Sequence, residues 1–256
     1  MPISTLTCRA ALLISMLAVS FGCRSNVPAK QDVTIAAAAN LTAVFEKLGP
    51  KFEAQTKIHP IFNFGSTAQL ARQIESSAPF DVFAAADAEH VDDLDRKGLL
   101  LPGSSAVYAT GVLALWVPAG SKASVGRVDD VTMPEVKVIA VAKPELAPYG
   151  QATVDSLKSL GIWDKVQSKV VYAENISMAK QYGVSNNADA VFTAYSLVVK
   201  EPGRVIPVEE SLHAPITQKL GILAHSQHVE AAQRFVDFLV RGGGRDILSG
   251  FGYKVK

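Results

Sequence analysis

Residues 33–64 read VTIAAAANLTAVFEKLGPKFEAQTKIHPIFNF, in which two apolar β-rich segments, 33–38 and 58–64, flank a segment with helical periodicity, 41–56. A strand, a helix and a second strand in this order are typical of a parallel βαβ unit. Pro50 lies inside the helical segment and has no backbone N–H. We therefore expect the helix to be broken or kinked near Gly49 and Pro50.

The same alternation continues to the end of the chain. Further strands are predicted at residues 81–86, 111–117, 137–142, 169–173, 190–195, 204–208 and 219–225. The clearest further helices contain AQLARQIES, EHVDDLDRKG, QATVDSLKSLG and VEAAQRFVDFLVRG. This order of segments predicts an α/β protein with two lobes, each a mainly parallel sheet flanked by helices.

Two crossings between the lobes are expected, near residues 106–112 and 213–220. They divide the chain into lobe 1, residues 32–110 plus 217–256, and lobe 2, residues 111–216. A cleft between the lobes would close by a hinge motion about these crossings. A single large doubly wound sheet is the alternative that the pattern leaves open.

The N-terminal 22 residues have the features of a signal peptide. Arg9 precedes an apolar run, residues 10–22, that is too short to span a bilayer as a helix. The run ends at Gly22-Cys23 and resembles a bacterial lipobox, although Ser20 occupies a position where such boxes usually carry a Leu-like residue. Lipidation of Cys23 is predicted, with residues 23–31 as a linker, and cleavage to a free periplasmic protein is the alternative. Both imply export.

Composition excludes several classes of protein. The chain of 256 residues is 48% hydrophobic and 19% charged, as ordinary globular proteins are, which excludes disorder. Its 25 basic and 24 acidic residues form no basic block, which argues against nucleic-acid binding. Loss of Arg9 with the signal peptide would leave 24 basic residues against 24 acidic ones, so net charge cannot recruit a ligand. Two cysteines cannot form a disulfide framework or a four-thiolate metal site.

Small and polar residues follow four of the predicted strands. In open α/β sheets, ligands bind beyond the carboxyl ends of strands, where the first turns of helices present N–H groups that favour anions. The four junctions, two in each lobe, carry Asn40, Ser66-Thr67, Pro148-Tyr149 and Asn175-Ile176. Each alone is also an ordinary helix start, with Asn175 as a plausible cap. Together they indicate an anion site without Lys or Arg, which favours a fully deprotonated tetrahedral dianion over hydrogen phosphate.

Longer segments resemble a known family. They are AAAANLTAVFEKL, FGSTAQLARQIESSAPFDVFAAADAEHVDDL, AKPELAPYGQATVDSLKSLGIWDKV, YAENISMAKQYG and the closing GFGYK. In order and spacing they are similar to the molybdate-binding proteins of bacterial ABC importers, over residues 32–256. The resemblance implies a periplasmic-binding-protein fold that captures molybdate or tungstate and delivers it to the membrane subunits of an ABC permease. It also implies a monomer that is not an enzyme and has no cofactor, with molybdenum bound as its oxyanion and not by direct protein ligands.

The resemblance also implies site residues. Asn40 takes the place of the family's first-loop Ser, with Ala39 contributing backbone, and the second-loop hydroxyl falls on Thr67, with Ser66 as its nearest competitor. Tyr149 corresponds to the family's Ala-or-Tyr position and Ile176 to its Val position, used through the backbone. A family Tyr aligns with Thr193, and Tyr195 lies two residues on. Thr193 and Tyr195 are therefore further candidates, and the two-residue repeat of a strand would place both side chains on one face. Alternatively, Tyr149 supplies the phenol group to the ligand in their place.

Two other functions are kept as alternatives. The chain could bind a different oxyanion, such as sulfate. An exported hydrolase on the same fold would need a nucleophile–base pair, and no Ser–His or Cys–His pairing is suggested, so no catalytic residue is predicted. We interpret Asp81 and Asp87 as structural or helix-capping residues, and His225 and His228 as residues of a solvated turn.

Overall fold

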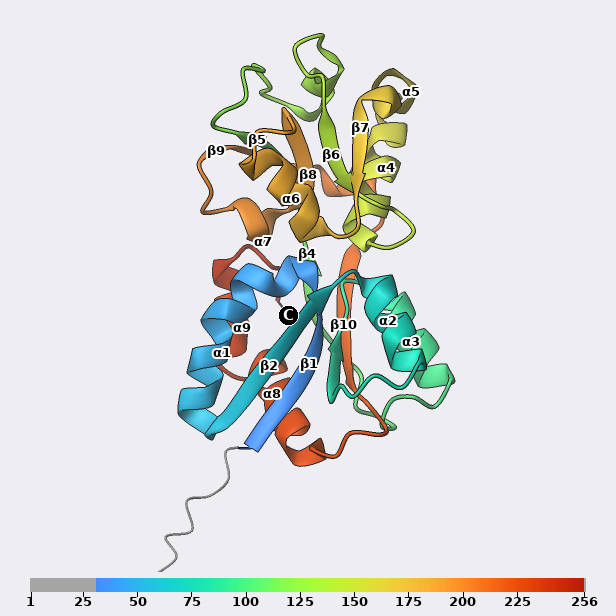
Figure 1. Cartoon of the computed structure of the whole chain (residues 1–256), viewed down its shortest axis with the longest axis vertical. Helices are drawn as coiled ribbons and strands as arrows, with labels where there is room; N and C mark the ends of the chain where they lie inside the picture. Colours follow the sequence, from blue (N-terminus) through green and yellow to red (C-terminus); the bar gives the residue numbers. More distant parts are fainter. Residues whose placement is uncertain (1–30, 256) are drawn as a thin grey trace, which may run out of the picture.

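The computed structural model describes residues 31–255, which form two lobes stacked along the long axis of the molecule (Figure 1). The predicted signal peptide and Cys23 lie outside the described residues. No helix within this range combines the length and the apolar character that crossing a membrane requires.

Lobe 1 is built on a sheet of strand order β2-β1-β3-β10-β4. Its strands are β1 (Gln31–Ala38), β2 (Ile58–Gly65), β3 (Val82–Ala84), β4 (Ala106–Gly111) and β10 (Ile216–Ile222). One face is covered by α1 (Thr42–Thr56), α8 (Val229–Val240) and α9 (Gly244–Gly250), and the other by α2 (Thr67–Glu75) and α3 (Glu89–Arg96) (Figure 1). Phe45, Phe62 and Phe235 pack against one another in the core beneath α1.

Lobe 2 repeats the plan with strand order β7-β6-β8-β5-β9. Its strands are β5 (Leu113–Pro118), β6 (Ile139–Ala142), β7 (Val170–Ala173), β8 (Ala190–Ala194) and β9 (Gly203–Pro207). Its helices are α4 (Pro148–Ser159), α5 (Trp163–Val166), α6 (Ile176–Val184) and α7 (Tyr195–Val198). Four 3-10 turns complete the described elements: η1 (Ala39–Leu41), η2 (Val128–Thr132), η3 (Gln167–Lys169) and η4 (Glu210–Leu212).

Each sheet contains one reversed strand. β10 is antiparallel to both β3 and β4, and β5 is antiparallel to both β8 and β9, whereas β1, β2 and β3, like β6, β7 and β8, pair in parallel. The other strands of each sheet therefore share one direction. The predicted fold class, two lobes with mainly parallel sheets, is confirmed, and the single-sheet alternative was wrong.

The first crossing differs from the prediction of one strand at 111–117. β4 ends at Gly111, which pairs with Ile216, and β5 begins at Leu113, which pairs with Ala194 in the other sheet. Only Val112 separates the two strands, and its carbonyl accepts a hydrogen bond from the Tyr195 N–H (2.9 Å). The return strand begins at Ile216 rather than at residue 219, because it pairs with β4 as soon as it enters lobe 1.

Two helices also differ from expectation. α1 is one continuous helix with Pro50 inside it. Its neighbour Gly49 is buried against β2, where an added Cβ would lie 2.9 Å from the Phe62 ring, so packing holds the helix across the proline. The helix predicted over VEAAQRFVDFLVRG ends at Val240, and α9, which was not predicted, begins at Gly244.

Candidate functional site

A small pocket lies between the lobes, at the carboxyl ends of β1, β2 and β3 from lobe 1 and β6 and β7 from lobe 2. Its empty space is about 200 Å³, opening included. It is lined by Ala38, Ala39, Asn40, Gly65, Ser66, Thr67, Ala86, Ala147, Pro148, Tyr149, Asn175 and Ile176. Ala39, Asn40, Ser66, Thr67, Tyr149 and Ile176, which the sequence predicts as ligand-binding residues, are thus brought together.

Short side chains make the backbone accessible on the walls of this pocket. Ala38, Ala39, Ala86 and Ala147 are all buried, and each ends in a single methyl group. A ligand in the pocket can therefore approach peptide N–H groups closely. This arrangement suits a small ligand that is recognised mainly through main-chain hydrogen bonds.

Three helices begin at the pocket. α2 starts at Thr67, α4 at Pro148 and α6 at Ile176. The first N–H groups of a helix have no acceptor one turn back, and the helix dipole gives them partial positive charge. The N–H groups of Thr67, Tyr149 and Ile176 hold such positions, so the three helix starts together favour an anion.

Asn175 caps α6 as predicted. Its Oδ1 accepts a hydrogen bond from the Met178 N–H (3.0 Å), which fixes the first turn of the helix. The junction at Pro148 is a helix start, as expected, and Pro148 occupies the first turn of α4, where a missing N–H costs nothing. Both residues line the pocket but act on helix geometry.

The pocket has no ionised wall. Among its described lining residues there is no Lys, Arg, Asp or Glu. Burial raises the pKa of the Tyr149 phenol well above its ordinary value, so this side chain also stays neutral. An anion here would meet only dipoles and neutral donors.

Two hydroxyl groups compete for the position on the second loop. Thr67 Oγ1 accepts a hydrogen bond from the Ala86 N–H (3.1 Å) and still has its own hydrogen to donate. Ser66 Oγ donates to Gln69 Oε1 (2.7 Å) and would have to turn from it to reach a ligand. Both side chains are at most 2% exposed.

The side chains of Asn40 and Tyr149 point toward a buried polar cluster. Asn40 Nδ2 donates to Gln218 Oε1 (2.9 Å) and to Tyr253 Oη (2.8 Å), and Tyr149 Oη accepts from Gln218 Nε2 (2.8 Å). Sequence reasoning missed Gln218 and Tyr253. The available signal was Gln218 itself, a polar residue at an inward position of β10 between Ile216 and Leu220.

The further candidates Thr193 and Tyr195 do not line the pocket. Thr193 lies inside the lobe 2 sheet opposite Ala114, with its hydroxyl buried and without a partner. β8 ends at Ala194 and Tyr195 begins α7, so the expectation that both share one strand face was wrong. The Tyr195 ring packs instead on Gly252, where an added Cβ would lie 2.4 Å from it.

Direct hydrogen bonds join the lobes around the pocket. The Ala68 N–H donates to the Leu146 carbonyl (3.2 Å), and Gln69 Nε2 donates to Glu174 Oε2 (3.1 Å). Ser177 Oγ donates to the Ala39 carbonyl (2.8 Å). The structure therefore represents a closed arrangement of the two lobes.

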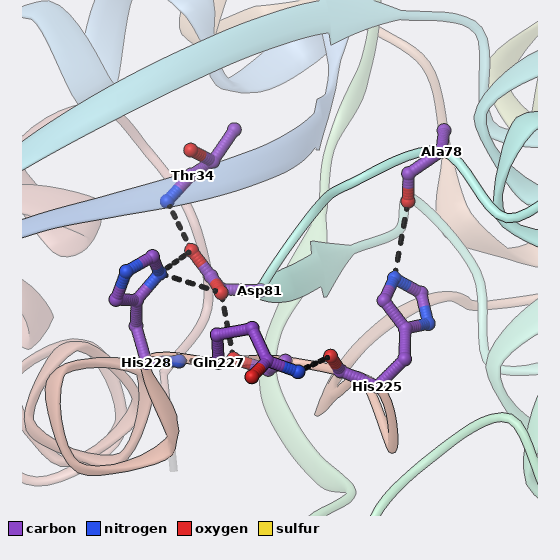
Figure 2. A network of polar contacts seen from close by, with 7 residues as sticks. Thr34, Ala78, Asp81, His225, Gln227 and His228 are labelled. Atoms are coloured by element: carbon purple, nitrogen blue, oxygen red, sulfur yellow. Dashed lines mark hydrogen bonds and ion pairs between the residues drawn. The ribbon is translucent and has the colours of Figure 1, made fainter.

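Asp81, which the sequence suggested as a structural carboxylate, ties together segments of lobe 1 away from the pocket (Figure 2). Its oxygens accept hydrogen bonds from the Thr34 N–H (2.8 Å) and Ser226 Oγ (2.6 Å). His228 Nδ1 lies 3.2 Å from the same carboxylate, so His228 is more than a residue of a solvated turn. Asp87 caps the start of α3 by accepting from the His90 N–H (3.1 Å). No group of three or more potential metal ligands occurs within residues 31–255.

The two lobes, the hinge-like crossings and the neutral pocket between them define a solute-binding protein. The chain belongs to the family of bacterial extracellular solute-binding proteins, whose family model matches residues 33–254. It is 34% identical over 226 residues to the molybdate-binding protein ModA of Rhodobacter capsulatus, covering 87% of this chain and 88% of the relative. It is also 34% identical over 250 residues to ModA of Azotobacter vinelandii, covering 94% of this chain and 97% of the relative. The solved structure of the periplasmic molybdate-binding protein of Azotobacter vinelandii superimposes with a TM-score of 0.83 at 28% identity, over 88% of this chain and 99% of that one.

Proposed function

We propose that this protein binds molybdate, or the similar oxyanion tungstate, outside the cytoplasm and delivers it to an ABC-type membrane permease. The observation that carries the proposal is the convergence on a small uncharged pocket of three helix N-termini, one from lobe 1 and two from lobe 2, and of the Ser66 and Thr67 hydroxyls of lobe 1. The molybdate-binding function named for its relatives supports the same ligand. The protein acts as a monomer, without catalysis or a cofactor.

The pocket can supply the binding energy without a basic residue. A micromolar dissociation constant corresponds to about 8 kcal/mol. Hydrogen bonds to a charged group contribute roughly 1.5–3 kcal/mol each, so about half a dozen donors are sufficient after binding costs are subtracted. Because the donors come from both lobes, only the closed form completes the shell, and the ligand stabilises that form.

The lobe boundaries proposed from sequence, 32–110 plus 217–256 for lobe 1 and 111–216 for lobe 2, place the hinge at the two crossings. The closed form then presents one continuous surface from both lobes, and the permease recognises that surface. This is how ligand occupancy is communicated to the membrane subunits.

Calorimetry with molybdate, tungstate, sulfate and phosphate tests the ligand. We expect molybdate and tungstate to bind with micromolar or lower dissociation constants, and sulfate and phosphate to bind at least about a hundredfold more weakly, since cavity size and donor geometry discriminate among oxyanions. Sulfate binding as tight as molybdate binding would make the protein a sulfate or general oxyanion binder.

Single substitutions test the site. Asn40→Ala and Tyr149→Phe should each raise the dissociation constant for molybdate by about tenfold or more. Each substitution removes either a charge-assisted hydrogen bond to the ligand or a contact that supports one. Ser66→Ala and Thr67→Val separate the two hydroxyls, because only the one that donates to the ligand should cause a similar loss. If all four variants bind as the wild type does, the ligand occupies a different pocket.

We further propose that Cys23 carries a lipid anchor after removal of residues 1–22. The support is the lipobox-like Gly22-Cys23 junction that follows the apolar run. Metabolic labelling with a fatty acid should mark the wild-type protein and not a Cys23→Ala variant. An unlabelled wild-type protein in the soluble periplasmic fraction would instead show simple cleavage.

A further inference from the structure

Six polar side chains form a closed cluster directly behind the pocket. They come from both lobes and from the crossing strand β10, and each is at most 5% exposed. The cluster consists of Asn40, Tyr108, Tyr149, Ser196, Gln218 and Tyr253. Two of its members, Asn40 and Tyr149, also line the pocket.

Gln218 is one of two residues that connect these pocket residues, since the Tyr253 hydroxyl also bonds with both Asn40 and Tyr149. Gln218 Oε1 accepts from Asn40 Nδ2 (2.9 Å) and from Tyr108 Oη (2.7 Å), and Nε2 of the same side chain donates to Tyr149 Oη (2.8 Å). A rotation of this amide by 180° would place its NH₂ group against the NH₂ group of Asn40. With Asn40 oriented as it is here, the Gln218 amide therefore takes the matching orientation.

The position of Gln218 in the fold suits a coupling role. It is fully buried on β10, at the point where the pairing with β4 shifts register. Gly111, on the other crossing, leaves room for this contact, since an added Cβ there would lie 2.0 Å from Tyr149 Oη and 2.5 Å from Gln218 Nε2. Both crossings and one pocket loop from each lobe thus meet at this amide.

We propose that Gln218 is a positioning residue for oxyanion binding, which holds Asn40 of lobe 1 and Tyr149 of lobe 2 in the arrangement that the closed pocket requires. This inference rests on the proposed function. The Gln218–Tyr149 hydrogen bond joins the lobes, whereas the bonds to Asn40 and Tyr108 stay within lobe 1. Opening of the cleft breaks the Gln218–Tyr149 hydrogen bond and keeps the bonds to Asn40 and Tyr108. Gln218 therefore favours the closed form and slows release of the ligand.

The first test replaces the amide by an apolar side chain of similar length. Gln218→Met should raise the dissociation constant for molybdate at least about tenfold, mostly through faster dissociation in stopped-flow measurements. Ser156→Ala is the matched control, because its buried hydroxyl bonds only to the Ala152 carbonyl within α4 (2.7 Å). That control should change thermal stability without changing affinity. A Gln218→Met protein that loses stability but keeps wild-type affinity would show a merely structural role.

A double-mutant cycle tests whether Gln218 acts through Tyr149. Combining Gln218→Met with Tyr149→Phe should weaken binding by less than the product of the two single effects, because both break the same contact. Fully multiplicative effects would overturn the proposal. If Gln218→Met does not fold, Tyr108→Phe removes one of the two donors to Gln218 and should weaken binding about two- to fivefold, and unchanged affinity in that variant would count against the proposal.

Gln218→Glu adds a signature that packing alone would not give. Burial raises the pKa of a carboxyl group, and its protonated form can accept from Asn40 and donate to Tyr149 as the amide does. Molybdate affinity of this variant should rise as the pH falls from about 8 to about 5, while that of the wild type stays flat. A flat profile for the variant contradicts the inference. Absence of molybdate binding by the wild type would instead refute the proposed function.

Discussion

Gly111 shows how a single missing side chain shapes the site. It ends β4, and its Cα faces the Tyr149 hydroxyl and the Gln218 amide at a distance that excludes a Cβ. Any other residue would push Tyr149 or β10 away from the pocket. The need for glycine here comes from close approach, and no local turn signal marks it in the sequence.

Gly111→Ala should therefore lower the free energy of unfolding by about 1–3 kcal/mol, the usual cost of overpacking a buried site. It should also weaken ligand binding. Gly250→Ala is the control, because nothing lies within 4 Å of an added Cβ there, and its effect should stay within about 1 kcal/mol. Urea denaturation measures the free energy of unfolding of both variants. Equal losses of stability in the two variants would disprove the packing argument.

His90 provides a pH-dependent contribution to stability. Its Nδ1 lies 2.8 Å from Asp87 Oδ2, and this hydrogen bond, more than nearby charges, raises the pKa of His90 above its ordinary value. A raised pKa in the folded state means that the contribution is fully present below about pH 6.5 and is lost as the pH rises through the folded-state pKa.

The free energy of unfolding of the wild type should therefore exceed that of His90→Gln most at about pH 5.5, and the difference should shrink toward about pH 9. Denaturation curves at several pH values give the comparison. His225→Gln is the control, since the His225 ring contacts the Ala78 carbonyl rather than a carboxylate. If the difference in the free energy of unfolding between wild type and His90→Gln grew with pH, the contact with Asp87 would not stabilise the protonated form of His90.

At the scale of elements, α1 tolerates Pro50 because tertiary packing outweighs helix propensity. The proline is exposed, whereas Leu48, Gly49 and Phe52 are buried against the sheet and α8. Periodicity correctly predicted the helix, but it could not show that packing would carry the helix across the proline.

Pro50→Ala should raise the free energy of unfolding by about 2 kcal/mol. It restores a backbone donor and removes a ring clash worth about 3 kcal/mol, less the roughly 0.4–1 kcal/mol by which proline restricts the unfolded chain. Pro102→Ala, in an exposed turn, should act only through the unfolded chain and lower stability slightly. Thermal and urea unfolding test both signs, and destabilisation by Pro50→Ala would mean that the ring itself is needed.

The elements also show which parts of the site were predictable. Ser66, Thr67, Asn175 and Ile176 lie within three residues of a strand end, and Pro148 follows β6 after the short loop 143–147, so chain order alone places them at the carboxyl edge of a sheet. Gln218 and Tyr253 reach the site only through the return of the chain to lobe 1. The expected shared strand face of Thr193 and Tyr195 was wrong because the strand ends between them, a boundary that local pattern does not resolve.

For the whole molecule, the proposed function makes closure and ligand binding one equilibrium. Ala68, Gln69 and Ser177 make hydrogen bonds between the lobes, which opening of the cleft would break. Molybdate at a hundredfold excess over its dissociation constant should stabilise the protein by about 2.7 kcal/mol. We also expect the radius of gyration in small-angle X-ray scattering to decrease when molybdate is added. Stabilisation without compaction would mean that the free protein is already closed.

The strand order has a consequence for how the chain acquires its structure. All five strands of lobe 2 lie within residues 113–207, whereas lobe 1 needs β10, residues 216–222, as an interior strand between β3 and β4. A growing polypeptide therefore contains everything for the second sheet while the first still has a gap in its middle. Lobe 1 is therefore begun first and completed last. Until β10 has been synthesised, the facing edges of β3 and β4 are exposed to incorrect pairing partners.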